Sequence, residues 1–480
     1  MLRLPSSCEG CPFYKYKDHV DNGFVPDKIV QGSEVFFLLQ NPGKDEAEGH
    51  QLIQRRYHNG TGHSDVYSTV HPQPLLGATG QLFNTRFLPL TGLQRGEVSL
   101  GNSIRCRPGK ALGLQKADEL PSITSTMKLE HSKADIVNAL KHCKMAHFRP
   151  PESTRVVVTS GRHAMFVMTG LSRDEDEYHK KQSVLESWRG YGVELDEYNS
   201  IRTVDTSRYH TLQAGKKLVF MTMHLAALFY GDNKKYYHAV LQDFHKIKRL
   251  LNGDWPKVMP TWYRMPPDTW PKYAAFDTEY NPKTNELYRW SMCSSEGELY
   301  CVEADRSSVI PVEPGSTVII QNELADFRRL KGLIDVKSIK IEDLMIAHST
   351  LWTGEPHSLN YINSMYGQLN RYKHLSFDNP EFYSAADSWE PMNIWRNEFL
   401  PQFRADKQSW EVYKRYRLPL ARIINKAQET GVMIDSTRLG EVRDILISRI
   451  EGYKDRAREI TGDDKFELGG QKQMREVMYG

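Results

Sequence analysis

The stretch Phe276-Asp277-Thr278-Glu279 decides how the second half of the chain is interpreted, because it places two carboxylates two residues apart. It continues a run that begins at Tyr273 and is typical of a β-strand. Side chains at i and i+2 of a strand lie on the same face of a sheet. Two neighbouring carboxylates on one face can hold a divalent cation, although acidic pairs also occur on solvated faces.

Two further groups of polar residues follow and extend this pattern. Asn322 and Asp326 come shortly after the apolar run 318–320. Tyr383 and Asp387 are four residues apart, which places them on one face of a helix. Phosphodiester hydrolysis with two metal ions needs carboxylates that hold the metals, and a tyrosine hydroxyl can orient the attacking water.

The ordered set resembles the DEDD exonucleases, and more closely the proofreading domain of family A DNA polymerases. Glu342-Asp343 and His357-Ser-Leu359 match further landmarks of that family. The resemblance implies a ribonuclease H-like fold, two Mg²⁺ or Mn²⁺ ions and 3′–5′ exonuclease activity on DNA. The site residues that it implies are the metal ligands Asp277, Glu279, Asp326 and Asp387, the catalytic Tyr383 and the DNA contact Asn322.

The first half of the chain alternates short apolar runs with helical patterns, which is typical of an α/β fold with a parallel sheet. The patterns predict strands at 35–39, 155–159 and 218–223, and helices at 80–91, 162–168 and 236–251. Ligands of such sheets bind beyond the carboxyl ends of the strands. We therefore expect the loops after these strands to converge on one pocket.

These loops carry the residues that a pocket for an extruded base would need. Gln40 and Asn41 follow the first strand, Asn102 follows a later one and His224 follows the last. Leu75 stands where a loop opens a helix. An amide can pair with the edge of a base, and a histidine can polarise its carbonyl group.

The pattern resembles the uracil-DNA glycosylase superfamily, closest to its iron–sulfur, family 4-like branch. The resemblance implies a [4Fe–4S] cluster on Cys8, Cys11, Cys106 and Cys143, because thiolates are the standard ligands of such clusters. A four-cysteine zinc site is the alternative. The resemblance further implies that Asn102 recognises the base, Asn41 positions the water and His224 stabilises the departing base.

The chain departs from that family at three positions. Gln40 stands where an acidic residue is typical, Leu75 stands where an aromatic side chain stacks on uracil, and Leu225 rather than Pro follows His224. An asparagine cannot take the proton of an attacking water. We therefore expect either slow base excision or a pocket that only senses or binds DNA.

Two other groups of residues in the first half are weighed as DNA or metal ligands. Arg105 and Arg107 are expected to contact DNA phosphates. An insertion carries four histidines, for which we expect a polar loop rather than a metal site: His50, His58, His63 and His71.

The expected domains are a glycosylase-like domain at 1–252, a linker at 253–271, an exonuclease domain at 272–403 and a third unit at 404–480. Five prolines and three tryptophans in the linker exclude a helix or a central strand. In the third unit, 417–435 and 466–473 resemble the segment that leads into the thumb of family A polymerases. We expect the palm and fingers on the same protein or on a second chain.

Composition limits the function classes. The 480 residues carry 63 Lys and Arg against 60 Asp and Glu, a net charge of +3, which excludes a histone-like binder but permits a basic DNA groove. Six cysteines are too few for a disulfide scaffold, and no apolar run is long enough to span a bilayer. We expect a cytoplasmic, multidomain α/β protein that forms the proofreading half of a bacteriophage-type polymerase. The alternatives are a stand-alone DNA repair protein and a first domain that only clamps DNA or docks a protein.

Overall fold

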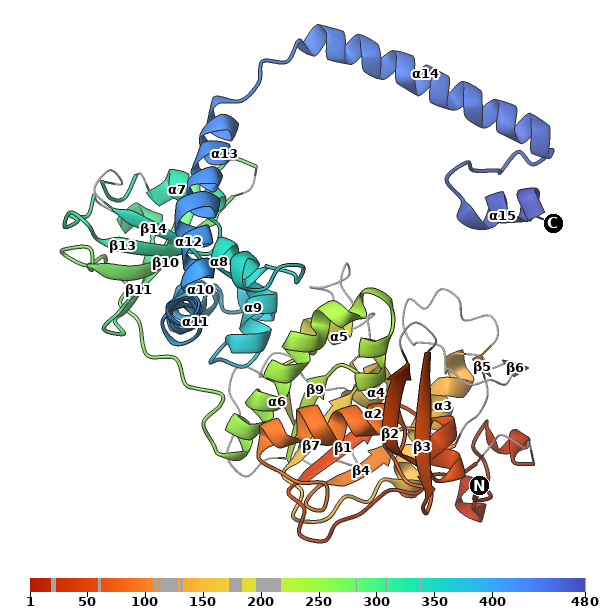
Figure 1. The fold of residues 1–480 in the computed structure, drawn as a ribbon. Helices are drawn as coiled ribbons and strands as arrows, with labels where there is room; N and C mark the ends of the chain where they lie inside the picture. The colour runs from red at the N-terminus through yellow and green to blue at the C-terminus, as the bar shows by residue number, and fades with distance from the viewer. Residues whose placement is uncertain are drawn as a thin grey trace. The chain divides into compact units, whose positions relative to one another are not determined.

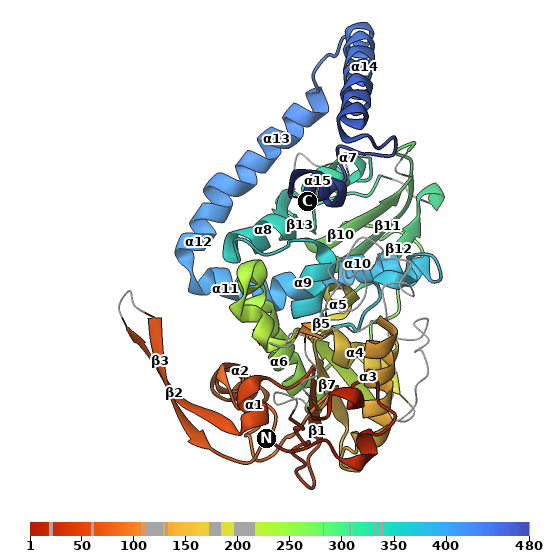
Figure 2. The same cartoon turned by 90° about the vertical axis from the view of Figure 1, so that its right-hand side faces the viewer.

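The computed structural model describes residues 1–18, 23–58, 62–106, 110–111, 128–129, 133–171, 184–195, 217–281, 283–306, 309–330, 332–335 and 339–479. The chain divides into two compact units, Met1–Leu418 and Pro419–Gly480. The first unit contains two five-stranded sheets (Figures 1 and 2). We call residues 1–252 the first-sheet domain and residues 272–418 the second-sheet domain. In the described ranges no helix is long and apolar enough to cross a membrane.

The first sheet is parallel except at one edge. Its order is β4 (Ser99–Asn102), β1 (Val35–Leu39), β7 (Val156–Ser160), β9 (Lys217–Thr222) and β8 (Gly192–Leu195), of which only β8 runs antiparallel to its neighbour. All residues of β1 and β7 are buried, as expected for strands covered on both faces. The predicted parallel α/β architecture is therefore confirmed.

Helices cover both faces because side chains alternate along the central strands. Phe36 and Leu38 pack in one core with α3 (Lys133–His147) and α4 (Arg162–Thr169). Phe37 and Leu39 pack in the opposite core with the helical segment 78–91, which begins with α2 (Ala78–Leu82), and with α6 (Tyr237–Leu251). Two short helices complete this domain: α1 (Lys44–Glu48) and α5 (Val184–Trp188).

The histidine-containing insertion differs from its prediction. It forms an antiparallel ladder of β2 (His50–His58) and β3 (Gly62–Thr69) instead of an irregular polar loop. The two-residue strands β5 (Lys110–Ala111) and β6 (Lys128–Leu129) pair in parallel elsewhere.

The second sheet is mixed, with both antiparallel and parallel strand pairs. Its order is β12 (Leu299–Glu303), β11 (Leu287–Ser294), β10 (Tyr273–Tyr280), β13 (Thr317–Ile320) and β14 (Lys340–Asp343). The first three strands form an antiparallel meander, and β13 and β14 run parallel to β10. Helix α10 (Pro380–Ile394) packs against β10 and β11.

The remaining helices of the second-sheet domain surround this sheet. They are α7 (Glu323–Leu330), α8 (Leu344–Leu351), α9 (Leu359–Tyr366), α11 (Leu400–Ala405) and α12 (Lys407–Val412). Tyr413 and Leu418 are buried in the same core as Ala275 of β10. Residues 404–418 thus pack with the second sheet, although the sequence grouped them with the C-terminal helices.

The linker and the C-terminal helices follow their sequence patterns. Residues 253–271 contain no helix or regular strand, and Trp255 and Trp270 are buried. The second unit consists of α14 (Ser436–Thr461), α15 (Gln471–Tyr479) and nearly all of α13 (Leu418–Thr430). The Asp435 side chain accepts a hydrogen bond from the Arg438 N–H, so Asp435 is the N-cap of α14, as predicted.

Candidate functional site

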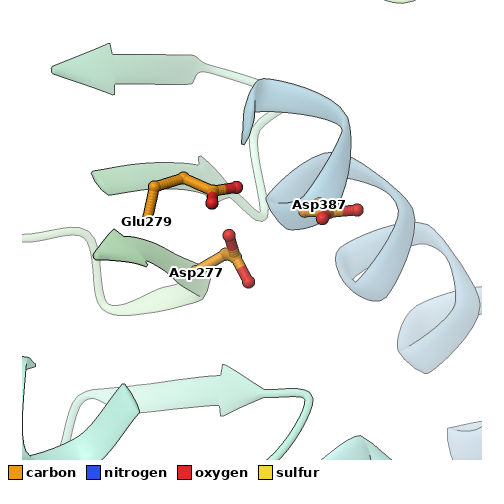
Figure 3. A group of neighbouring side chains, drawn as sticks. All are labelled: Asp277, Glu279 and Asp387. Carbon is orange, nitrogen blue, oxygen red and sulfur yellow. The ribbon is translucent and has the colours of Figure 1, made fainter. Parts of the chain in front are cut away.

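Three predicted carboxylates lie together above the second sheet. Asp277 and Glu279 project from the same face of β10 toward Asp387 on α10 (Figure 3). Each offers a carboxylate oxygen, and these oxygens all lie within 4.8 Å of one another. A set of three oxygen ligands at this spacing fits a hard divalent cation such as Mg²⁺ or Mn²⁺.

The electrostatics of this group also fit a cation. Burial raises the pKa of Asp277 well above its usual range, and the neighbouring carboxylates of Asp387 and Asp326 raise it further. Burial and the charge of Asp387 raise the pKa of Glu279 to about 7. Carboxylates crowded in this way repel one another, and a bound divalent cation relieves that repulsion.

The other predicted residues of this site lie on α10 and on or directly before α7, with differing contacts. Asp326, on α7, is outside the group of three, and its carboxylate accepts a hydrogen bond from the Thr278 hydroxyl. Tyr383 lies one turn before Asp387 on α10 and is half-buried. Asn322 directly precedes α7 and is also half-buried.

Two residues at this site had no signal in the sequence. The Tyr372 hydroxyl donates a hydrogen bond to Asp387 Oδ1 at 2.7 Å. The Lys373 Nζ lies 2.6 Å from Asp387 Oδ2 and 3.5 Å from the Tyr383 hydroxyl. Neither residue has a spacing to the acidic motifs that would mark it, because the chain brings them together only through tertiary packing.

A cavity of about 680 Å³ opens at the carboxyl ends of β1, β4 and β9. Its lining includes all five residues that the sequence placed in a base pocket: Gln40, Asn41, Leu75, Asn102 and His224. The loops converge because the strands that precede them are parallel neighbours, or nearly so, in one sheet.

Two of these residues have properties that suit a polar ligand. Asn102 is fully buried, and neither its Oδ1 nor its Nδ2 has a hydrogen-bond partner among the described residues. A buried amide normally satisfies both groups. Burial lowers the pKa of His224 to about 4, so its imidazole is neutral at pH 7.

The backbone at Leu75 is strained. Its φ of 62° lies in the left-handed region, which residues with a branched side chain seldom adopt. The Leu75 N–H is held by a 2.5 Å hydrogen bond to the Glu46 carboxylate. Strain that the surrounding contacts maintain is characteristic of functional loops.

The sequence reasoning missed two carboxylates in this cavity. Asp45 and Glu46 both line it, although Gln40 and Asn41 had suggested a pocket without acidic groups. Glu46 accepts hydrogen bonds from Gly43 N–H and Leu75 N–H, and burial raises its pKa to about 7. A signal was present, because a Glu three residues after a helix N-cap can accept a hydrogen bond from the backbone N–H of that cap, here Gly43.

The four predicted cluster cysteines line a second, smaller cavity. Burial and, to a smaller extent, the neighbouring thiols of Cys143 and Cys11 raise the pKa of Cys8 to about 12. Burial likewise raises the pKa of Cys106 well above its usual range. Thiols in this position lose their protons when a metal centre supplies compensating charge.

The spacing of these sulfur atoms bears on the two metal alternatives. Among the described residues, which include all four cysteines, no three of the sulfurs lie within 4.8 Å of one another. Four thiolates on one zinc ion would lie about 3.8 Å apart. In a [4Fe–4S] cluster the four thiolates bind different iron atoms, so the sulfurs need not lie this close together.

The structure corrects the expectation for Arg105. This residue is 1% exposed, and its guanidinium pairs with Asp27 through hydrogen bonds of 2.8 and 2.6 Å. Its Nη1 also lies 3.5 Å from the Cys143 sulfur. Because it is buried beside the cysteines, Arg105 is not available to a DNA phosphate. Arg107 lies outside the described residues.

Comparison with known proteins finds weak similarity to glycosylases. No protein-family model matches the chain. The Type-4 uracil-DNA glycosylase of Sulfurisphaera tokodaii is 21% identical over 246 residues, which are 51% of this chain and 80% of that protein. The Type-4 uracil-DNA glycosylase of Saccharolobus solfataricus is 21% identical over 249 residues, 51% of this chain and 82% of that protein.

Solved structures that resemble parts of the chain include a nuclease-type and a polymerase-type protein. NrnC of Brucella melitensis with bound Mg²⁺ covers 35% of this chain and 92% of its own, with 17% identity and a TM-score of 0.27. The POL domain of Pol1 from M. smegmatis, in complex with a DNA primer-template and dNTP, covers 43% of this chain and 36% of its own. Its identity is 14% and its TM-score is 0.34.

Proposed function

We propose that the second-sheet domain is a metal-dependent 3′–5′ exonuclease that proofreads for a family A-type DNA polymerase. The observation that supports this most strongly is the group of Asp277, Glu279 and Asp387, which gathers carboxylates of two separate motifs at one point. The order of the motifs along the chain and the mixed sheet beneath them also support it.

In this proposal each residue has a distinct role. Two Mg²⁺ or Mn²⁺ ions, held by Asp277, Glu279, Asp326 and Asp387, would supply an activated water and stabilise the departing 3′ oxygen. Tyr383 orients the attacking water, and Asn322 contacts the DNA strand. The substrate is a single-stranded or frayed 3′ end.

The test compares two substitutions in the same domain. Asp277→Ala should lower the rate of single-strand digestion by at least ~10²–10³, because it removes a metal ligand. Glu296→Ala is the matched control, since Glu296 is an exposed carboxylate in the turn between β11 and β12. Digestion by Asp277→Ala at the rate of the control would refute the assignment.

We further propose that the first-sheet domain binds an extruded base and excises uracil slowly. The unpartnered amide of buried Asn102 supports this, because it presents one donor and one acceptor to the cavity. In this proposal neutral His224 donates a hydrogen bond to the leaving base and Asn41 positions the water. Gln40 and Leu75 contribute contacts with the base.

A uracil-containing oligonucleotide tests this second function. Asn102→Ala should abolish the formation of abasic sites, whereas Asn233→Ala should not, although Asn233 lines the same cavity. If the wild type forms no abasic sites but DNA binding weakens in Asn102→Ala, the pocket binds or senses DNA without excision. If neither excision nor binding changes, the domain has a different role, such as docking a protein.

The exposed side chains of the C-terminal helices favour the proposal that the chain works with the rest of a polymerase. Among the described side chains of 419–479, the apolar side chains of α13 and α14 are largely exposed, and Met433 between these helices is 99% exposed. Exposed apolar helix faces of this kind usually pack on another surface. We propose that the surface that covers these helix faces belongs to the palm and fingers, on the same protein or on a second chain.

A further inference from the structure

The carboxylate of Asp387 is held by two residues that are adjacent in the sequence. Tyr372 donates a hydrogen bond to Oδ1, and Lys373 forms an ion pair with the same carboxylate. All three side chains are buried. The direction of the Asp387 carboxylate therefore depends on where residues 372 and 373 are placed.

The two preceding residues are fixed by the first-sheet domain. The Gly192 N–H donates to Asn370 Oδ1 at 3.0 Å, and Asn370 Nδ2 donates to the Gly192 carbonyl at 2.9 Å. Asn370 thereby pairs with the first residue of the edge strand β8. The Arg371 guanidinium lies 4.1 Å from the ring centroid of Trp188, the last residue of α5. Such close stacking on an indole ring fixes the guanidinium.

Four consecutive residues therefore connect the first-sheet domain to a carboxylate of the acidic site. Residues 370 and 371 contact β8 and α5, and residues 372 and 373 contact Asp387. The two residues before these four are also held in place. The N–H groups of Gln368 and Leu369 donate hydrogen bonds of 2.9 and 2.6 Å to Glu390, which lies one turn after Asp387 on α10. We call residues 370–373 the connecting segment.

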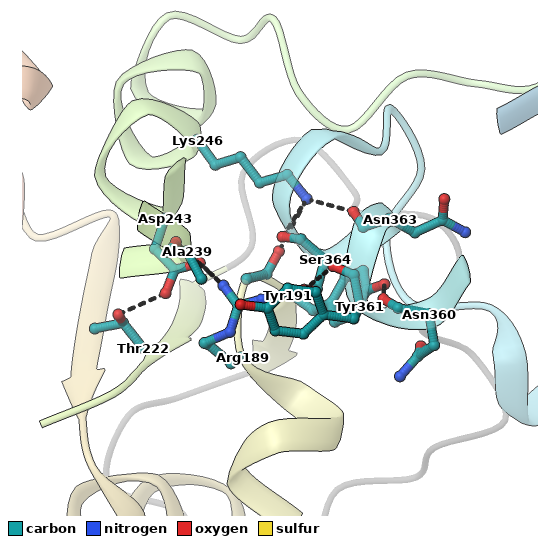
Figure 4. Close-up of polar contacts among 11 residues, drawn as sticks. Arg189, Tyr191, Thr222, Ala239, Asp243, Lys246, Asn360, Tyr361, Asn363 and Ser364 are labelled. Atoms are coloured by element: carbon teal, nitrogen blue, oxygen red, sulfur yellow. Dashed lines mark hydrogen bonds and ion pairs between the residues drawn. The ribbon is translucent and has the colours of Figure 1, made fainter. Parts of the chain in front are cut away.

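The first-sheet domain also contacts α9 through polar side chains, among them Arg189 and Lys246 (Figure 4). Arg189 pairs with Asp243 at 2.6 Å and contacts Ser364 of the second-sheet domain. Lys246 donates to the carbonyl oxygens of Asn363 and Ser364 at 3.1 and 2.9 Å. The Arg189–Asp243 pair lies within the first-sheet domain, whereas the hydrogen bonds of Arg189 and Lys246 with residues 363 and 364 cross between the domains. Separating the domains would break these crossing hydrogen bonds.

We propose that the first-sheet domain positions Asp387 for metal binding, with Trp188 and Asn370 acting as positioning residues through the connecting segment. This inference rests on the proposed exonuclease function, which assigns Asp387 to a Mg²⁺ or Mn²⁺ ion. It follows that the acidic site is complete only when both domains are docked. The first-sheet domain then serves the exonuclease even if its own cavity excises no base.

The experiment uses the full chain and measures Mn²⁺ binding by electron paramagnetic resonance of the free ion, with 3′-end hydrolysis in parallel. Asn370→Ala and Trp188→Ala should each weaken Mn²⁺ binding about ten-fold, as is typical when the support of a metal ligand is lost. Trp188→Phe keeps a ring beneath Arg371 and should restore most of the affinity. Arg371→Lys keeps the charge but not the planar stack, and should behave like Trp188→Ala.

His238→Ala provides the matched control at the same interface. The His238 ring stacks on Trp352 at 3.5 Å and hydrogen-bonds with the Tyr366 hydroxyl at 2.6 Å, away from the connecting segment. Its loss should leave Mn²⁺ affinity within about two-fold of the wild type, because it shares no partner with Asp387.

The outcomes separate the inference from the function on which it rests. If Asn370→Ala and Arg371→Lys bind Mn²⁺ as tightly as His238→Ala does, the positioning role is refuted while the exonuclease stands. The same conclusion follows if all the interface variants weaken binding equally. If the wild type neither binds Mn²⁺ nor shortens 3′ ends, the exonuclease proposal itself is refuted. Thermal unfolding identifies any variant that does not fold, and Arg371→Lys then replaces Asn370→Ala.

Discussion

Glu46 shows how burial alone changes the chemistry of a single carboxyl group. Its pKa rises from the ordinary 4.5 to about 7 because the side chain is buried, although two backbone N–H groups oppose the change. Between pH 4.5 and 7 the folded protein therefore holds a proton that the unfolded chain has released. The free energy of unfolding must then fall as the pH rises through this window.

Glu46→Gln replaces the carboxyl group with an amide that does not titrate. The variant should therefore show a weaker dependence of its free energy of unfolding on pH. Between pH 4.5 and 7 the free energy of unfolding of the wild type should fall by up to about 3 kcal/mol more than that of the variant. Thermal unfolding of both proteins at several pH values measures it. Other buried carboxyls contribute equally to both proteins, so equal slopes would mean that Glu46 is ionised throughout.

The four cysteines give a second prediction at the residue scale. Anaerobically purified protein should be brown and hold about four irons per chain, because four thiolates are the ligand set of a [4Fe–4S] cluster. Cys143→Ser should lose iron, whereas Cys293→Ser should not, since Cys293 is a core residue of the second sheet. A colourless protein with one zinc per chain would contradict the cluster.

At the scale of elements, Gly190 marks where the first-sheet domain approaches α9. Its φ of 77° is left-handed, and a Cβ there would lie 2.1 Å from the Ser364 carbonyl oxygen. Gly190→Ala should therefore cost roughly 3 kcal/mol, from backbone strain and the clash together. Gly297 also has a left-handed φ, 92°, but nothing lies within 4 Å of its Cβ position.

Gly297→Ala is thus the matched control and should cost only about 1 kcal/mol, from strain alone. Denaturant unfolding measures both values. Equal losses in the two variants would mean that the contact between Gly190 and Ser364 is not close in solution.

Elements with a clear period or cap were predictable, and those set by tertiary contacts were not. The apolar run 35–39 and the cap at Asp435 predicted β1 and α14, because period and capping are local properties. The β2–β3 hairpin was missed because its polar strands lack an apolar face. The three grouped carboxylates could be named from motif order, but Tyr372 and Lys373 could not. Their role depends on a fold that brings residue 373 to residue 387.

At the scale of the whole molecule, Met1–Leu418 should unfold as one cooperative unit. The domains share buried hydrogen bonds, such as those that Arg189 and Lys246 donate to Ser364, and these would be lost if one domain unfolded. Hydrogen exchange should show equal protection of β7 and β10 and much faster exchange in α14, whose side chains are largely exposed. Two well-separated unfolding transitions within 1–418 would contradict this prediction. Gly190→Ala should weaken the contact between the two domains and so make separate transitions more evident.

The most direct test of the central claim is the direction and product of DNA hydrolysis. A single-stranded oligonucleotide labelled at its 5′ end is incubated with the full chain and Mg²⁺, and its fragments are resolved over time. The account predicts a ladder that shortens one nucleotide at a time from the 3′ end and releases nucleoside monophosphates. Two 3′-terminal phosphorothioate linkages should slow the ladder, and Asp277→Ala should lack it. Internal cleavage, loss from the 5′ end or an undiminished ladder with Asp277→Ala would contradict the account.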